Sequence, residues 1–140
     1  ANNMKVRHVG DAAALPRAIQ TEIADITEKT NHYTGTTVQL AINYGGKDEI
    51  VRAIKKLSAA QLETLTEDAF EQLLDTAGVP PVDLVIRTGG EKRLSNFLLW
   101  QTAYAEFYST DILWPDFTPA HLMEALDAYG KRIRRFGRIV

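Results

Sequence analysis

The stretch that decides the fold runs from residue 82 to residue 90 and reads Val82-Asp-Leu-Val-Ile-Arg-Thr-Gly-Gly90. Four of its first five residues are apolar, which is typical of a short strand whose two faces are covered by helices. A rigid turn, Pro80-Pro81, precedes the stretch, and a glycine pair ends it. The stretch therefore predicts a buried strand that delivers Arg87 at its carboxyl end.

Strand and helix patterns alternate on both sides of this stretch. Strands are predicted at residues 5–9 and 36–42, and helices are predicted after Asp11, over residues 50–57, after Thr66 and after Thr118. A small irregular strand is expected between residues 89 and 116. This order predicts an α/β fold with a largely parallel sheet flanked by helices. No linker or internal repeat interrupts the pattern, so we expect residues 1–140 to form a single domain.

The composition excludes several classes of protein. Hydrophobic residues make up 45% of the chain and charged residues 24%, which excludes a disordered protein or a fibre. Cysteine is absent, which excludes a disulfide scaffold and a thiolate nucleophile. The chain has a formal net charge of −2, so it does not show the excess of basic residues that is typical of many nucleic-acid-binding proteins. No apolar run approaches the ~20 residues of a membrane span, and no secretory signal is visible, so we expect a cytoplasmic protein.

The residues after the predicted strand favour the binding of an anion. Ligands of parallel sheets bind beyond the carboxyl ends of the strands, where Arg87 and the glycine pair are expected. Arg93 and Ser95 follow within eight residues of Arg87. Two guanidinium groups, a hydroxyl and backbone N–H groups exposed by glycine suit the oxygens of a phosphate or diphosphate. The alternative is an ordinary turn whose arginines pair with Glu91 and Asp83.

A longer run of residues carries a resemblance to a known family. Residues 83–106 begin Asp-Leu-Val-Ile-Arg-Thr-Gly-Gly and end Ala-Tyr-Ala-Glu, and Leu113-Trp-Pro-Asp-Phe117 follows them. Together they closely resemble the cis-prenyltransferases, which include the bacterial undecaprenyl diphosphate synthases. Asn43-Tyr-Gly-Gly46 and Arg134-Arg-Phe-Gly137 match two further motifs of that family in the same order. The resemblance implies a transferase that condenses isopentenyl diphosphate with an allylic prenyl diphosphate to form a cis-polyprenyl diphosphate.

The resemblance also implies roles for individual residues. Arg87, Arg93 and Ser95 would hold the diphosphate of isopentenyl diphosphate. Glu106 matches an acidic residue that the family uses in catalysis and in magnesium binding, so Mg²⁺ is the expected cofactor. The full set of substrate-binding residues implied by the motifs is Arg87, Arg93, Ser95, Arg135, Gly137 and Asn43.

Further features of the resemblance concern a partner subunit and two departures from the family pattern. Arg135 and Gly137 match an Arg-x-Gly motif that reaches the active site of the partner subunit, so we expect a homodimer with residues 95–116 at its interface.

The chain contains no Asp-Gly dipeptide, and the family's Asp-Gly-Asn loop therefore has no counterpart here. Lys92 stands where some members carry histidine. We expect the chain to correspond to the C-terminal portion of such a fold, without its N-terminal strands and helices, and to be inactive alone.

Two other functions stay open from the sequence. Relatives without the Asp-Gly-Asn loop can act as non-catalytic partner subunits, and this chain keeps the interface region and the Arg-x-Gly tail. The basic segment 131–138 could instead belong to a small anion-binding α/β module. We expect no nucleic-acid partner, and at most a peripheral membrane contact through a lipid product.

Overall fold

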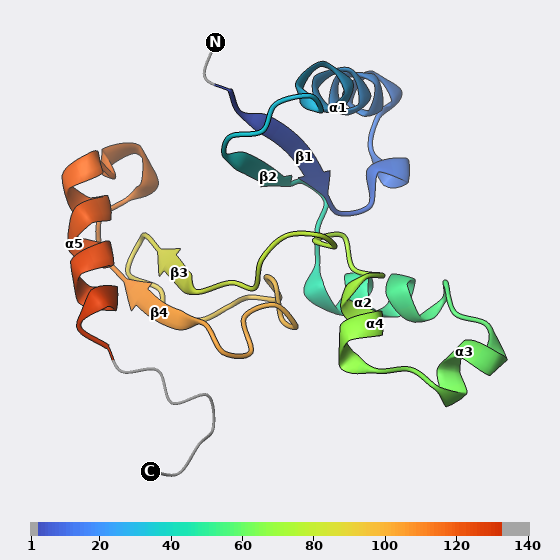
Figure 1. Ribbon diagram of the computed structural model, residues 1–140. Helices are drawn as coiled ribbons and strands as arrows, with labels where there is room; N and C mark the ends of the chain where they lie inside the picture. Colours follow the sequence, from blue (N-terminus) through green and yellow to red (C-terminus); the bar gives the residue numbers. More distant parts are fainter. Residues whose placement is uncertain (1–2, 133–140) are drawn as a thin grey trace. The chain divides into compact units, whose positions relative to one another are not determined.

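The structure, a computed structural model, describes residues 3–132 and divides into two compact units, Ala1–Val79 and Pro80–Val140. Within the described residues, every strand pair is parallel: β1 pairs with β2 in the first unit and β3 with β4 in the second. Helices flank both ladders (Figure 1). The expected α/β fold with parallel strands is therefore confirmed, while the single domain over residues 1–140 stays a prediction.

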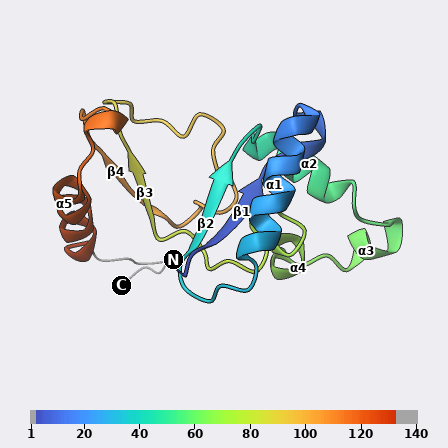
Figure 2. The ribbon, with the colours of Figure 1, turned by 90° about the horizontal axis from the view of Figure 1, so that it is seen from above.

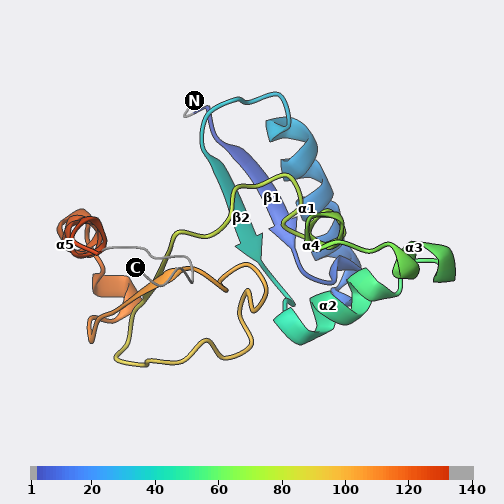
Figure 3. The same ribbon diagram turned by 60° about the horizontal axis from the view of Figure 1, so that its bottom comes forward.

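The first unit is built on strands β1 (Lys5–Val9) and β2 (Thr37–Ala41), with Lys5 opposite Thr37 in the register. Helix α1 (Arg17–Thr30) packs against β1, as Figure 3 shows. The Thr30 hydroxyl ties the end of this helix to the strand, because it accepts a 2.9 Å hydrogen bond from the Val6 N–H. Both strands lie where the sequence predicts them.

The start of α1 differs from the prediction for a physical reason. Asp11 caps a separate short 3₁₀ helix, Ala12–Ala14, and its Oδ1 accepts a 3.0 Å hydrogen bond from the Ala13 N–H. Leu15 is extended, with φ −83° and ψ 157°, as expected of a residue that precedes proline. The chain can therefore resume a helix only after Pro16.

Three further helices complete the first unit: α2 (Gly46–Ile54), α3 (Ala59–Glu63) and α4 (Glu67–Glu71). Helix α2 overlaps the helix predicted over residues 50–57 but begins and ends earlier, and α4 begins after Thr66 as predicted but ends at Glu71. Helix α3 was not predicted, and it forms around a capping box in which Ser58 and Gln61 satisfy each other's backbone N–H groups. The buried residues of this unit come from β1, α1, α2, α4 and the segment after α4, and they include Val9, Thr30, Glu49, Ala53, Phe70 and Leu74.

The second unit contains β3 (Leu84–Arg87), β4 (Glu106–Ser109) and α5 (Pro119–Gly130). Helix α5 lies beside β4 (Figures 1 and 2). It begins at the predicted Thr118, whose N–H donates to Nδ1 of His121 at 3.0 Å. None of the helices in the described part of the chain is long and apolar enough to cross a membrane.

Candidate functional site

The glycine pair after β3 folds back onto the segment that follows β4. Gly89 and Gly90 have φ values of 84° and 76°, in the left-handed region that glycine adopts most readily. Their N–H groups donate to the carbonyl oxygens of Ile112 and Thr110, each at 2.9 Å. These two N–H groups are used within the chain, so the expectation that they would face a ligand is wrong.

Arg87 and Ser95 are brought together beyond the carboxyl end of β3. Arg87 is the last residue of that strand and lies opposite Ser109 of β4. Its Nη1 atom donates to the backbone carbonyl oxygen of Arg93 and to Oγ of Ser95, the second contact being 3.4 Å long. The Arg87 guanidinium is thus held over an exposed loop, next to a hydroxyl group that can also donate to a phosphate oxygen.

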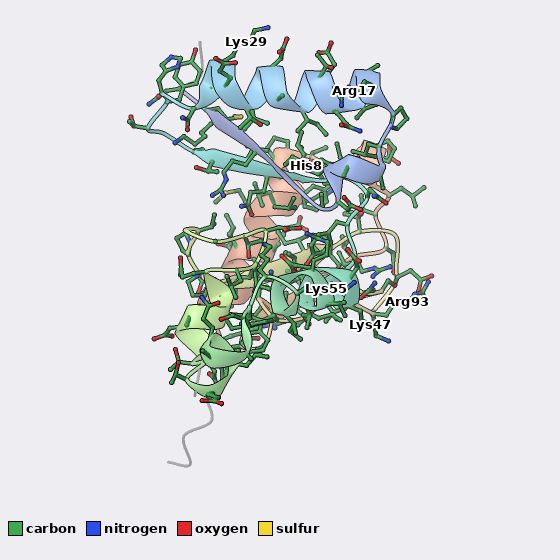
Figure 4. The ribbon with its side chains drawn as sticks, turned by 90° about the vertical axis from the view of Figure 1, so that its right-hand side faces the viewer. His8, Arg17, Lys29, Lys47, Lys55 and Arg93 are labelled. Carbon is green, nitrogen blue, oxygen red and sulfur yellow. The ribbon has the colours of Figure 1, made fainter. Side chains whose placement is uncertain are left out.

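The Arg93 side chain forms a different contact. Its guanidinium pairs with the Glu91 carboxylate, and the two side chains are 63% and 46% exposed. Figure 4 shows the Arg93 side chain projecting outward from the ribbon of its own unit. Such an exposed ion pair is worth at most about 1 kcal/mol, so an incoming anion can replace Glu91. The pairing of Arg93 with Glu91 agrees with the alternative of an ordinary turn, whereas the meeting of Arg87 and Ser95 agrees with an anion site.

The loop that carries Ser95 has an unusual backbone. Ser95, Asn96 and Leu98 have φ values of 50°, 64° and 44°. Residues other than glycine rarely adopt this left-handed backbone conformation, and a bulky residue such as Leu98 adopts it least often. Backbone of this kind persists only where the surroundings fix it, and it is common at ligand-binding sites. The position of the Ser95 hydroxyl is therefore set by the loop backbone as well as by its own rotamer.

Glu106 lies at the opposite end of the same ladder. It is the first residue of β4 and is opposite Leu84, three positions before Arg87. At about 3.3 Å per residue, the Arg87 and Glu106 positions are about 10 Å apart along the strands. Oε2 of Glu106 accepts a 2.6 Å hydrogen bond from Nη1 of Arg132, and the two side chains are 27% and 39% exposed respectively. Within this ladder, Glu106 and Arg87 belong to separate clusters.

Asn43 lies in the first unit, just after the carboxyl end of β2. Its φ of 51° is left-handed, and its Nδ2 donates to the carbonyl oxygen of Asp11 at 2.9 Å. The Asp11 N–H returns a 3.1 Å hydrogen bond to the Asn43 carbonyl oxygen. Asn43 thus joins the loops that follow β1 and β2.

An ion pair between Arg52 and Asp75 contacts the loop that follows β1. The Arg52 guanidinium donates to both carboxylate oxygens of Asp75, at 2.9 and 2.7 Å. Oδ2 of Asp75 also accepts a 2.9 Å hydrogen bond from the Gly10 N–H. Burial alone would raise the pKa of Asp75, but the hydrogen bond and charge of Arg52, together with the Gly10 N–H, hold this pKa below its ordinary value. The hydrogen bond to Asp75 likewise raises the pKa of Arg52.

Glu49 is buried next to this pair. It is 1% exposed, and its Oε1 accepts a 2.8 Å hydrogen bond from the Asp75 N–H. Its Oε2 accepts a 2.5 Å hydrogen bond from the Tyr44 hydroxyl. Hydrogen bonds of this kind offset part of the free energy that it costs to bury a carboxyl group away from water. Glu49 therefore couples the loop after β2 to the segment after α4.

Comparison with known proteins decides the family. The family described as "Putative undecaprenyl diphosphate synthase" matches residues 1–137. The chain is 57% identical over 136 residues to an isoprenyl transferase of Treponema denticola, a match that covers 97% of this chain and 60% of that protein. It is 54% identical over 138 residues to the isoprenyl transferase of Treponema pallidum, covering 96% and 60% respectively. The chain belongs to this prenyltransferase family.

A solved structure agrees with the assignment to the prenyltransferases. The crystal structure of lavandulyl diphosphate synthase from Lavandula x intermedia, in complex with dimethylallyl diphosphate, is 38% identical and superposes with a TM-score of 0.91. The match covers 99% of this chain and 62% of that one. The chain thus spans about 60% of the length of the curated relatives it matches.

The described residues of this chain fit Mg²⁺ in one limited way. Residues 3–132 contain no group of three or more His, Asp or Glu side chains placed to hold a metal ion. Mg²⁺, however, commonly takes one or two carboxylates from a protein and completes its shell with substrate phosphates and water. Glu106 can supply one such carboxylate, because Arg132 engages only its Oε2 atom. The motif residues Arg135 and Gly137 lie outside the described residues.

The sequence did not reveal the two long-range charged pairs of this chain. Arg52 and Asp75 are 23 residues apart, and Glu106 and Arg132 are 26 residues apart. Neither pair has a local motif.

Proposed function

We propose that this chain contributes the isopentenyl-diphosphate-binding part of a cis-prenyltransferase. The convergence of Arg87 Nη1 and Ser95 Oγ beyond the carboxyl end of β3 is the observation that carries the proposal. A guanidinium group and a hydroxyl group both donate hydrogen bonds, and phosphate oxygens only accept them. Arg93 joins them in the proposal by exchanging its exposed contact with Glu91 for the diphosphate.

The proposed reaction explains why a fixed diphosphate matters. A carbon–carbon bond forms between the terminal alkene carbon of isopentenyl diphosphate and C1 of the allylic substrate. The allylic diphosphate leaves with the bonding electron pair, and the isopentenyl unit loses a proton to restore a double bond. Because Arg87 and Ser95 hold the diphosphate of the attacking substrate, its alkene is presented in a limited set of positions. Such positioning can supply roughly 7–11 kcal/mol of a reaction barrier.

The proposal includes a cofactor, a second copy of the chain and a compartment. We assign Glu106 as one ligand of Mg²⁺, which would offset the negative charge of the diphosphate groups. A homodimer is supported by large side chains exposed in the second unit, where Trp114 is 75% and Tyr104 is 67% exposed. Arg135 and Gly137 would then serve the active site of the partner subunit. We place the reaction in the cytoplasm.

Substitution of Arg87 tests the proposal in the whole protein that contains this chain. Loss of a charge-assisted contact costs about 1.5–3 kcal/mol, so Arg87→Gln should raise the KM for isopentenyl diphosphate about 10- to 100-fold. Lys29→Gln is the matched control, because Lys29 forms only an exposed pair with Asp25 on α1. The assay is incorporation of labelled isopentenyl diphosphate into lipid product. An unchanged KM in Arg87→Gln would overturn the proposal.

The same assay tests the expected dependence on the rest of the protein. The 140 residues contain no Asp-Gly dipeptide and therefore no Asp-Gly-Asn loop for the allylic substrate. We expect these residues alone to give no labelled product with farnesyl diphosphate and Mg²⁺. Robust turnover by the chain alone would show that its own residues form a complete active site.

A further inference from the structure

The contact between Arg132 and Glu106 has no part in the proposed binding of isopentenyl diphosphate. Nη1 of Arg132 donates to Oε2 of Glu106 at 2.6 Å. Among residues 3–132, no other cationic side chain pairs with this carboxylate. The contact joins the residue just past α5 to the first residue of β4. It therefore determines where the Glu106 carboxylate lies and what else can reach it.

The surroundings of the pair leave it open to exchange. Glu106 is 27% and Arg132 is 39% exposed, so water reaches both groups. The backbone of Arg132 is fixed, because its N–H donates to the carbonyl oxygen of Tyr129 at 2.9 Å. The guanidinium is thus aimed at Glu106 by the end of α5 but is not enclosed there. A competing ion can displace it without disturbing a buried core.

We propose that Arg132 is a positioning residue that competes with a divalent cation for Glu106 and makes cation binding depend on diphosphate. This inference rests on the proposed function, in which Glu106 is a ligand of Mg²⁺. The guanidinium occupies Oε2, and its permanent positive charge repels a cation that approaches Oε1. A diphosphate removes this penalty, because its negative charge attracts the guanidinium and supplies oxygens to the cation. The cation is therefore retained together with the diphosphate and released without it.

Binding of Mn²⁺ to the whole protein, followed by electron paramagnetic resonance of the free ion, tests this inference without an activity assay. Without diphosphate, Arg132→Gln should bind Mn²⁺ about fivefold more tightly than the wild type, consistent with the loss of about 1 kcal/mol of ion-pair competition. Arg132→Lys keeps the charge and should bind Mn²⁺ as the wild type does. Lys29→Gln, which removes one exposed charge from α1, should have no effect. Added inorganic diphosphate should reduce the difference between Arg132→Gln and the wild type.

A second substitution separates this effect from a merely structural one. In a Glu106→Gln background, Arg132→Gln should no longer tighten Mn²⁺ binding. Unchanged or weaker binding in Arg132→Gln would overturn the inference, and so would a gain that persists without Glu106. If Glu106→Gln alone binds Mn²⁺ as tightly as the wild type, Glu106 is not a ligand, and the inference fails with that assignment. The KM test of Arg87 is independent of all these outcomes, so the two proposals can fail separately.

Discussion

The Arg52 guanidinium contacts both carboxylate oxygens of Asp75, at 2.9 and 2.7 Å, and so ties α2 to the segment after α4. The same carboxylate accepts a hydrogen bond from the Gly10 N–H at the end of β1. Three elements of the first unit therefore meet at one side chain. The stability of the loops after β1 and β2 should depend on this carboxylate more than on any exposed charge nearby.

Asp75→Asn should lower the free energy of unfolding of the first unit by about 2 kcal/mol, because it removes a charge-assisted contact and leaves Arg52 without its main partner. Asp48→Asn is the matched control. Asp48 pairs with the same guanidinium at 2.7 Å, but its side chain is 58% exposed, so we expect a loss below about 1 kcal/mol. Chemical denaturation of both variants measures the difference. Equal losses of unfolding free energy in the two variants would show that the Asp75 contact stabilises the unit no more than the exposed Asp48 contact does.

The lowered pKa of Asp75 predicts a sensitivity to acid. The unfolded chain binds a proton at this carboxyl at a higher pH than the folded chain does, so protonation favours unfolding. The stabilisation is complete above the ordinary aspartate pKa of about 4 and is lost as the pH falls through the lower folded-state value. The free energy of unfolding, measured by denaturation at several pH values from 6 down to 3, should therefore decrease more for the wild type than for Asp75→Asn. Parallel curves would contradict the assignment.

Two glycines with positive φ should respond differently to substitution by alanine. Gly10 and Gly78 have φ values of 123° and 75°, so alanine is strained at both. A Cβ at Gly10 would lie 2.4 Å from the carbonyl oxygen of Ile42, whereas a Cβ at Gly78 would meet nothing within 4 Å. Gly78→Ala should cost about 1 kcal/mol and Gly10→Ala about 3 kcal/mol or more. Thermal unfolding of the two variants compares them, and equal midpoints would argue against this close approach of the loops.

Local sequence patterns predicted much of the fold. The apolar run before the glycine pair predicted β3 and the position of Arg87, and the hydroxyl groups of Thr66 and Thr118 predicted the starts of α4 and α5. These signals act within a few residues, where caps and apolar periodicity decide the structure. A local effect also explains the difference after Asp11: the extended backbone of Leu15, before Pro16, separates the short 3₁₀ helix from α1.

The site was less predictable because its contacts join distant residues. The order of residues predicted that Arg87 and Ser95 would be close, and it offered the Arg93–Glu91 pair as an alternative to an anion site. It did not show that Arg93 would contribute its carbonyl oxygen to Arg87. It also gave no sign that the glycine N–H groups would be used by Thr110 and Ile112. Pairing between strands and side-chain direction decide these contacts, and both depend on the folded chain.

Binding of isopentenyl diphosphate to the whole protein, measured by calorimetry, tests the central claim most directly. Because Arg87 and Ser95 converge beyond β3, Arg87→Gln should weaken binding by at least about tenfold and Ser95→Ala by about threefold, while Lys29→Gln should bind as the wild type does. Added phosphate should compete with isopentenyl diphosphate in the wild type. Wild-type affinity in both Arg87→Gln and Ser95→Ala would show that the diphosphate is bound elsewhere and would contradict the account.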